Sequence, residues 1–339
     1  MGVSVRNEKS RRRAYLPVVT LVLILLGAAV VGVGGRQYAS AVVAQRAAVS
    51  RVVWGIGDQL GPAQANPLYL DGGAKMVSSW FNNPGDLSWM KGYAGTDFNN
   101  QYAANRALEL VVWLADSTDY AISPQFQTDI RTLTRLYKGS GPNYGPLYIV
   151  LFSEFETYKD GDAAYQAKLM SAYLSAVTVI HSEYAKARVA LGFGGYGWDG
   201  VHDRDLSAYR QVIDASDFTA VQQMQACDSD ANGQNIMVAK VRSSVKQLGS
   251  YGKPVMISHF KLWGDTACQI SAFDRFNREM FSDASLADLT ANRLFAWNFM
   301  SDHYVNDPGP VYTAFRSRIG AHLAAVRTSP IPPTAGLPN

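Results

Sequence analysis

The sequence lacks the short motifs that mark several large enzyme classes. The glycine segment after the first predicted strand, residues 57–61 (GDQLG), does not have the G-x-G-x-x-G spacing of a dinucleotide-binding loop. No G-x-S-x-G elbow is present, and neither is an H-x-H or H-E-x-x-H pattern. We therefore expect no nucleotide cofactor, no serine hydrolase of the elbow type and no transition-metal centre, and we assign no cofactor to this chain.

Most of the chain has no excess of basic over acidic residues. Residues 1–13 hold five Lys or Arg and one Glu, a charge of +4, so the rest of the chain carries +3 less +4, or −1. A nucleic-acid-binding protein needs a basic face for the phosphates, so we exclude that partner. Hydrophobic residues make up 47% and charged residues 17% of the 339 residues, which is typical of a globular protein.

One long uncharged run occurs, near the N-terminus. Residues 16–33 contain no charge, and the segment 14–35 is long enough to cross a hydrocarbon core of about 30 Å. The basic residues 1–13 precede it, which predicts a cytoplasmic tail and an extracytoplasmic body. We interpret 14–35 as a single-pass signal anchor in the lipid bilayer. The alternative is a signal peptide cleaved near Ala41, which would release a secreted protein.

The segments on either side of the body have simple compositions. Residues 36–50 are predicted to form a short stalk, and residues 328–339 a disordered, proline-rich tail. Residues 51–327 remain between them. This length suits one (β/α)₈ barrel, which typically needs about 250 residues.

Short apolar runs alternate with amphipathic stretches through the body. The predicted strands are 51–56, 76–80, 108–114, 147–152, 188–193, 218–224, 254–258 and 293–299, and the clearest predicted helices are 163–186, 236–248 and 270–281. Such alternation predicts an α/β fold with a parallel sheet and crossover helices. Eight repeats favour a closed (β/α)₈ barrel of the TIM type, and an open doubly wound sheet is the alternative.

Two glutamates directly follow the fourth predicted strand. An active site on this fold lies at the carboxyl ends of the strands, and an extended chain would point Glu154 and Glu156 to the same side, into the cleft. Glycoside cleavage needs a carboxylic acid for the leaving oxygen and a second carboxylate. We expect Glu154, Glu156 and Asp228 to be the catalytic candidates. One of the two glutamates would alternatively be a salt-bridge partner or a helix cap.

Aromatic and polar residues also gather at the predicted strand ends. Sugar rings stack on flat aromatic side chains, so a carbohydrate cleft needs several of them. The candidate substrate-binding residues are Asp58, Trp80, Asp86, Tyr196, Trp198, Asp199, His259, Trp263 and Trp297. The alternative is that the tryptophans fill the core and that His259 is structural.

This layout resembles the large group of (β/α)₈ glycoside hydrolases that carry an acid/base glutamate at the end of strand 4. The resemblance covers about residues 51–315 and rests on the architecture and on Ser153-Glu154, where the group usually has Asn-Glu. It implies a nucleophile glutamate at the end of strand 7, but residues 255–260 contain none, and His259 occupies that region.

Three interpretations of the missing glutamate follow. The second carboxylate comes from another strand, as Asp228, Asp199 or Asp58, or the enzyme is inverting, with more widely spaced carboxyl groups. In the third, the domain binds glycan without cutting it. We predict an endo-acting glycoside hydrolase on a cell-envelope or extracellular polysaccharide. The alternative is a non-catalytic, membrane-anchored glycan-binding or scaffold protein.

The chain has two cysteines, which follow neighbouring predicted strands. Cys227 comes after strand 6 and Cys268 after strand 7, so a closed barrel places them side by side on the catalytic face. An extracytoplasmic body lies in an oxidising compartment, where such a pair forms a disulfide. We therefore predict a Cys227–Cys268 bond.

Overall fold

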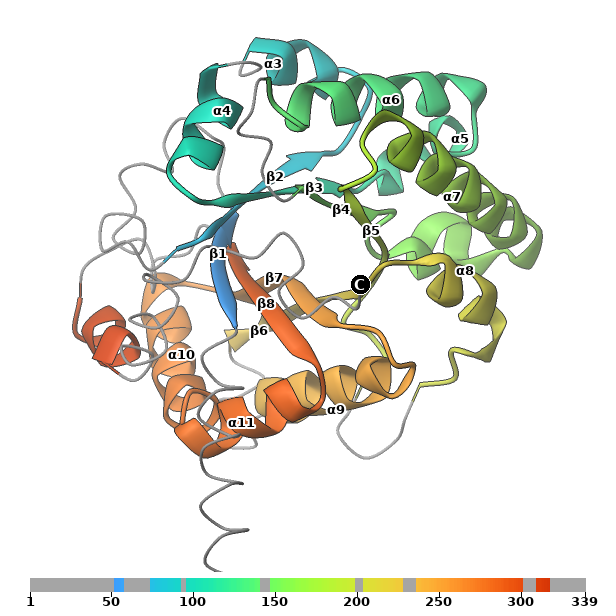
Figure 1. Ribbon diagram of the computed structural model, residues 1–339. Helices are drawn as coiled ribbons and strands as arrows, with labels where there is room; N and C mark the ends of the chain where they lie inside the picture. Colours follow the sequence, from blue (N-terminus) through green and yellow to red (C-terminus); the bar gives the residue numbers. More distant parts are fainter. Residues whose placement is uncertain are drawn as a thin grey trace, which may run out of the picture. The chain divides into compact units, whose positions relative to one another are not determined.

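The sheet closes on itself. The computed structural model describes residues 52–57, 74–92, 96–140, 147–198, 204–227, 236–300 and 309–317, and all of them belong to one unit, 48–339. Within it, eight parallel strands form a closed barrel in sequence order (Figure 1). They are β1 (Val53–Gly57), β2 (Met76–Phe81), β3 (Ala107–Val112), β4 (Leu147–Leu151), β5 (Arg188–Phe193), β6 (Thr219–Ala226), β7 (Val255–Trp263) and β8 (Leu294–Met300).

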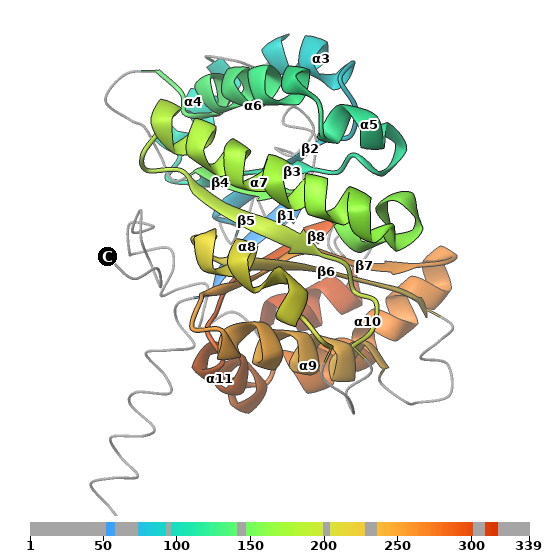
Figure 2. The same cartoon turned by 90° about the vertical axis from the view of Figure 1, so that its right-hand side faces the viewer.

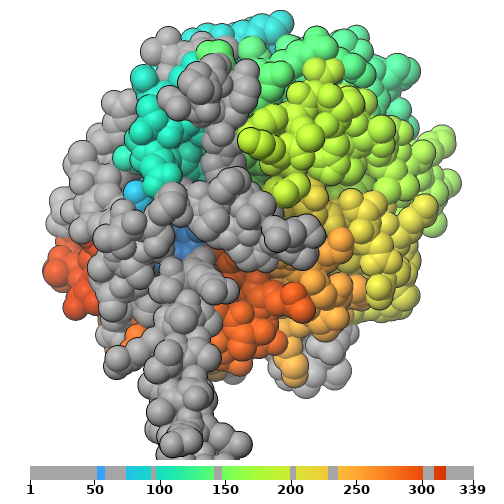
Figure 3. Space-filling model, viewed as in Figure 1, coloured from blue at the N-terminus to red at the C-terminus, as the bar shows by residue number. Residues whose placement is uncertain are grey.

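Helices surround the barrel and, from β2 onward, connect successive strands (Figures 1 and 2). They are α3 (Asp86–Gly92), α4 (Thr96–Ala103), α5 (Thr118–Ala121), α6 (Pro124–Tyr137), α7 (Ala163–Glu183), α8 (Arg210–Ala215), α9 (Ile236–Ser250), α10 (Thr266–Met280) and α11 (Asp283–Ala291). Short 3₁₀ segments precede several of them: η2 (Ala115–Ser117), η3 (Phe155–Gly161) and η4 (Ser207–Tyr209). The helices α6 and α7 pack side by side as one continuous surface in the space-filling view (Figure 3).

All eight predicted strands are confirmed, and the closed order excludes the open doubly wound sheet. Predicted helices 163–186 and 236–248 correspond to α7 and α9. The predicted helix 270–281 begins earlier than expected, at Thr266, because the Asp265 side chain caps it by accepting a hydrogen bond from the Cys268 N–H at 2.9 Å.

Two apolar layers stabilise the fold, one inside the barrel and one between the barrel and its helices. The inner layer includes Val53, Met76, Tyr148 and Phe218. The outer layer is larger and holds most of the buried Leu, Ile and Phe residues. Side chains alternate between the two layers because successive residues of a strand point to opposite faces.

A bulge in β7 changes this alternation. Val221 pairs with Ile257, but the next residue, Gln222, pairs with His259, so Ser258 is an extra residue in the strand. Met256 faces the barrel interior, and regular alternation from it would turn His259 outward. The bulge instead turns His259 toward the interior, beside Gln222. Bulges of this kind are common next to functional sites.

Several expected segments lie outside the described residues. These are the cytoplasmic tail 1–13, the anchor 14–35, the stalk 36–50 and the tail 328–339. Within the part of the chain that the structure describes, no helix combines the length and the apolar character that crossing a membrane requires.

Candidate active site

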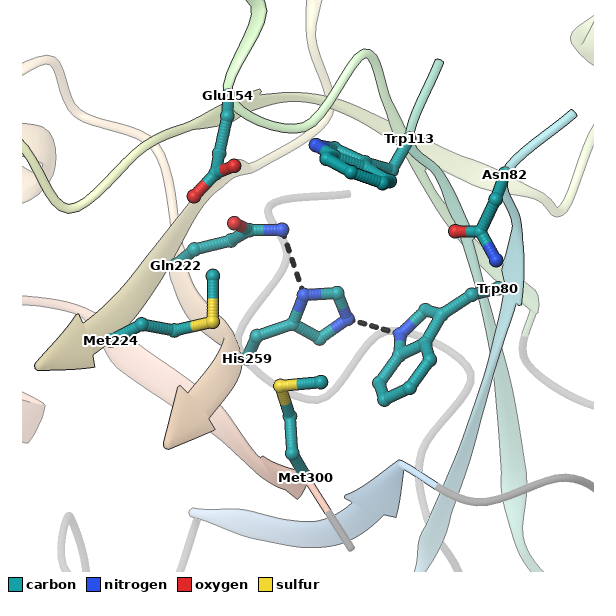
Figure 4. A pocket seen from close by; sticks show the side chains of 8 residues that line it. All are labelled: Trp80, Asn82, Trp113, Glu154, Gln222, Met224, His259 and Met300. Carbon is teal, nitrogen blue, oxygen red and sulfur yellow. Dashed lines mark hydrogen bonds between the residues drawn. The ribbon is translucent and has the colours of Figure 1, made fainter. Parts of the chain in front are cut away.

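A pocket of about 290 Å³ opens among the carboxyl ends of the strands. Figure 4 shows its lining side chains, which are Trp80, Asn82, Trp113, Glu154, Gln222, Met224, His259 and Met300. Two indoles and two thioethers make most of the wall apolar, and Glu154 is the single carboxyl group among these lining residues. A mainly apolar cavity with a few convergent polar groups is the usual form of a small-molecule or sugar-ring site.

A strained turn carries Glu154 into the pocket. The strand β4 ends at Leu151, and Phe152 and Glu154 both adopt left-handed backbone angles, with φ of 56° and 60°. Such conformations cost about 1–3 kcal/mol each in a non-glycine residue. Neighbouring strands hold the turn, since the Ser153 N–H donates to the Val112 carbonyl and the Glu154 N–H to the Gly192 carbonyl. The extended geometry expected for this segment is therefore wrong.

The pocket favours the protonated form of Glu154. Burial raises the pKa of its carboxyl above the ordinary value, and the negative charge of Glu156 raises it further. The Trp113 indole N–H, which points toward the carboxylate in Figure 4, acts in the opposite direction and lowers this pKa. A glutamic acid that keeps its proton near neutral pH is what general-acid catalysis needs.

Glu156 lies in a different environment from Glu154. Its Oε1 is 2.7 Å from Nη1 of Arg204, and both of its oxygens accept from the Gly194 N–H, at 3.1 and 3.2 Å. Burial raises the pKa of Glu156, and the Arg204 charge lowers it. The structure thus places Glu156 in an ion pair that holds the residues after β5, whereas Glu154 lines the pocket.

His259 forms the floor of the pocket between Trp80 and Gln222. The Trp80 indole N–H donates to its Nε2, and Nδ1 lies 2.8 Å from Nε2 of Gln222. The Trp80 and His259 rings meet edge to face, with centroids 4.9 Å apart. Burial lowers the pKa of His259 to about 3, so the ring is neutral at physiological pH.

A second buried carboxyl group, which the sequence interpretation missed, lies inside the barrel. Glu109 on β3 is fully buried and contacts the Asn298 amide nitrogen. Burial raises the pKa of Glu109 to about 8, and the hydrogen bonds of Ser78 and Asn298 oppose this shift. Gly55 leaves room for the pair, since a Cβ on it would collide with Asn298. Glu109 is not a lining residue of the pocket.

Three of the expected substrate-binding residues lie away from the pocket. Trp297 is fully buried and packs against Phe281 and Phe260, with ring centroids 5.1 and 5.5 Å apart. Its place on β8 directs it toward the helices. Trp198 is also buried, and its indole N–H donates to Oε1 of Gln247 at 2.7 Å. Both tryptophans belong to the outer apolar layer.

Asp86, the third of these residues, begins α3. Its carboxylate accepts hydrogen bonds from the Asn82 N–H at 2.7 Å and the Trp89 indole N–H at 3.1 Å. Two other expected residues, Tyr196 and Trp263, are exposed, at 55% and 45%. Trp263 ends β7 and Tyr196 follows β5. Asp58, Asp199 and the catalytic candidate Asp228 lie outside the described residues.

The predicted disulfide is confirmed. Cys227 and Cys268 are bonded, with their Cα atoms 5.7 Å apart. Gly264 lies beside the bond with a φ of 140°, and a Cβ at this position would collide with Sγ of Cys227. The bond links the end of β6 to the start of α10, on the same face as the pocket.

Five lining residues were absent from the sequence-based site. They are Asn82, Trp113, Gln222, Met224 and Met300. Gln222 could have been identified from the sequence, because a polar side chain inside an otherwise buried strand needs a hydrogen-bond partner or lines a binding site. Asn82 could also have been identified, as a polar residue directly after β2, whereas Trp113, Met224 and Met300 could not, since a methionine or tryptophan at a strand end is equally compatible with the core. Among the described residues, no group of three or more His, Cys, Asp or Glu could hold a metal ion.

Comparisons with known proteins agree with the barrel. No protein-family model matches the sequence, and no curated protein matches it. Similar solved structures include an endo-β-1,4-mannanase double mutant from Cellulomonas fimi, at 14% identity and a TM-score of 0.56, covering 81% of this chain and 71% of the other. The endo-1,4-β-D-mannanase from Thermotoga petrophila aligns at 13% identity and a TM-score of 0.54, covering 80% and 99%.

A third similar structure is the GH26C protein from Muricauda sp., at 10% identity and a TM-score of 0.56, covering 82% of this chain and 88% of the other. At such low identity, the similarity shows that the chain has the (β/α)₈ fold of these proteins. What the site does must be argued from its own residues.

Proposed function

We propose that this protein is an endo-acting glycoside hydrolase in which Glu154 is the general acid. The observation that carries the proposal is the Glu154 carboxyl, which lies at the end of β4 in a pocket walled by Trp80 and Trp113. Burial raises the pKa of this carboxyl above its ordinary value, which favours the protonated form that donates a proton to the leaving glycosidic oxygen.

The apolar walls suit the faces of a sugar ring. Indole rings stack on the C–H faces of sugars, and Met224 and Met300 add further apolar surface. Asn82 supplies an amide for hydroxyl groups. The exposed Tyr196 and Trp263 offer additional flat surfaces for neighbouring sugars of a long chain, which supports endo rather than exo cleavage.

The proposal assigns different roles to the two glutamates. Glu156 forms an ion pair with Arg204 and accepts a hydrogen bond from the Gly194 N–H, so it is poorly placed to transfer a proton. The second reacting carboxylate then comes from Asp228, Asp199 or Asp58. Analysis of the anomeric configuration of the first product by NMR would distinguish retention from inversion.

The experiment that tests this function is hydrolysis of a polysaccharide panel by the purified full-length chain. β-1,4-Mannan comes first, because two of the structurally similar proteins are named as endo-β-1,4-mannanases. We expect oligosaccharide release that Glu154→Gln abolishes and that Glu279→Gln, a change at an exposed position of α10, leaves intact. Equal release by Glu154→Gln would refute Glu154 as the acid.

The second candidate function is glycan binding without cleavage. It is favoured by the single carboxyl group among the described lining residues and by the neutral His259 on β7, in the region where the related hydrolases carry a nucleophile. Binding of a polysaccharide without any release of oligosaccharides, in both the native chain and Glu154→Gln, would support this alternative over hydrolysis.

We also propose that residues 14–35 anchor the protein in a membrane and that the barrel is extracytoplasmic. The uncharged run after a basic segment supports the anchor, and the Cys227–Cys268 bond fits an oxidising compartment. Fractionation of cells, with protease added to intact cells or spheroplasts, tests both points. Recovery of the barrel in the cytosolic fraction would contradict the assignment.

A further inference from the structure

Three side chains, the partly buried Trp80 and the buried His259 and Gln222, form a chain across the floor of the pocket from β2 to β6. The Trp80 indole N–H contacts Nε2 of His259, and Nδ1 of the same ring lies 2.8 Å from the Gln222 amide nitrogen. His259 is 4% exposed and Gln222 2% exposed. Figure 4 shows the three in sequence, with the Glu154 carboxylate on the far side of the Gln222 amide. Their hydrogen bonds must be satisfied largely by one another.

The indole fixes the position of the single His259 proton. An indole nitrogen is only a donor, so Nε2 of His259 must accept and carries no proton. Burial lowers the pKa of His259 to about 3, which keeps the ring neutral with one N–H group. That N–H group is therefore at Nδ1, the atom that faces Gln222.

A proton on Nδ1 determines the orientation of the Gln222 amide. The Nδ1–H group needs an acceptor, and an amide N–H₂ opposite it would set two donors against each other. With the amide oriented as in Figure 4, its Oε1 is buried and has no hydrogen-bond partner among the described residues. A half-turn about the Cγ–Cδ bond puts Oε1 on Nδ1–H and satisfies both groups.

We propose that Gln222 is a positioning residue for Glu154: its amide oxygen accepts from His259, and its N–H₂ group is thereby presented to the Glu154 carboxylate. The catalytic meaning of this contact rests on the proposed function, whereas the hydrogen-bond pattern does not. All three residues line the same pocket, and in Figure 4 the Gln222 amide and the Trp113 indole nitrogen lie on the side of the pocket from which the Glu154 carboxylate enters.

The arrangement has a consequence for the proton transfer. After Glu154 has given its proton to the glycosidic oxygen, the remaining carboxylate faces the N–H groups of Gln222 and Trp113. These groups stabilise the new negative charge and fix the carboxylate for reprotonation. The negative charge of Glu156 repels the Glu154 carboxylate, and the positive charge of Arg204 compensates that of Glu156.

The first test reads the tautomer and needs no substitution at residue 222. ¹⁵N NMR of the full-length chain labelled at histidine, with the His259 signals identified by their loss in His259→Gln, reports which ring nitrogen carries the proton. We expect a neutral ring protonated at Nδ1 near neutral pH. A ring protonated at Nε2, or at both nitrogens, would overturn the proposal.

The second test reads Glu154 directly. ¹³C NMR titration of the glutamate carboxyls gives the Glu154 pKa in the native chain, in Gln222→Met and in the control Gln225→Met, which changes a glutamine on the same strand that accepts from Lys240. Loss of the Gln222 N–H group is expected to raise the Glu154 pKa, and the control is expected to leave it unchanged. An unchanged Glu154 pKa in Gln222→Met would refute the positioning role.

Turnover supplies a third, separable readout. If the proposed function is correct, Gln222→Met lowers kcat about tenfold with little change in KM, and the basic limb of its pH profile moves to higher pH. A native chain without turnover would refute the hydrolase, and the carboxyl titration would still decide the role of Gln222.

Discussion

Arg204 Nη1 lies 2.7 Å from Oε1 of Glu156, two residues along the chain from the carboxyl group that lines the pocket. The two glutamates are nearly adjacent in sequence, but Glu156 has a cationic partner, whereas Glu154 lines a mainly apolar pocket together with Trp80 and Trp113. The ion pair opposes the rise that burial causes in the Glu156 pKa, and it also ties the turn after β4 to the residues after β5.

We expect loss of the Arg204 charge to destabilise the fold. Arg204→Met leaves the Glu156 carboxylate largely buried without its partner, which typically costs about 3–5 kcal/mol. The double variant Arg204→Met/Glu156→Gln removes the unpaired charge as well and should lose less than the sum of the two single changes. Urea unfolding of the four proteins measures this coupling. Additive losses would show that the ion pair contributes nothing beyond its separate parts.

If the proposed function is correct, the pH profile of hydrolysis should depend on Trp113. A general acid works only when protonated, so activity is lost as the pH rises through the Glu154 pKa. The Trp113 N–H lowers that pKa, so Trp113→Phe should move the basic limb to higher pH. Trp89→Phe, on α3, serves as the control and should leave the limb in place. A limb at the native pH in Trp113→Phe would show that the indole does not act on Glu154.

Removal of the Glu156 charge should move the same limb in the opposite direction. The negative charge of Glu156 raises the Glu154 pKa, so Glu156→Gln should shift the basic limb to lower pH. The shift should shrink at high salt only slightly, since buried charges are weakly screened. Rate measurements across the pH range, at low and high ionic strength, check both statements. A shift to higher pH would contradict the electrostatic assignment.

Glu109 should make the stability of the barrel depend on pH. Its folded pKa, about 8, lies above its ordinary value of 4.5. The folded state therefore retains a proton that the unfolded chain releases. The contribution of Glu109 to the free energy of unfolding is fully present below pH 4.5 and is lost as the pH rises toward about 8. Glu109→Gln cannot ionise. The free energy of unfolding of Glu109→Gln, measured in urea, should therefore rise relative to that of the native chain as the pH increases from 4.5 to about 8. A difference in unfolding free energy that does not change with pH would contradict the prediction.

The disulfide should contribute to the stability of the barrel. It joins residues 41 positions apart, and bonds of this kind typically stabilise by about 2–4 kcal/mol. We expect the double variant Cys227→Ala/Cys268→Ala to unfold at lower urea concentration than the native chain. Addition of a reductant should destabilise the native chain alone. Equal midpoints for the two proteins under oxidising conditions would show that the bond does not stabilise the fold.

The sequence was sufficient for the barrel and for part of the pocket at the carboxyl ends of its strands. Eight short apolar runs separated by amphipathic stretches predicted the strands, because a parallel strand covered on both faces must be apolar along its length. Once the strands were placed, Glu154, Trp80 and the two cysteines could be assigned to the carboxyl ends of those strands, where the loops of a barrel lie together. These statements depend on local pattern and on the order of elements, and a single sequence contains both.

Tertiary structure decided which side chains meet. The extra residue Ser258 turns His259 inward, and regular alternation would have turned it out. The left-handed turn at Glu154 separates it from Glu156, and Arg204, 48 residues after Glu156 in the sequence, completes the separation. Trp297 faces the helices because of its position on β8. Bulges, left-handed turns and distant ion pairs are fixed by the packing of the whole barrel, and so the local sequence alone could not specify them.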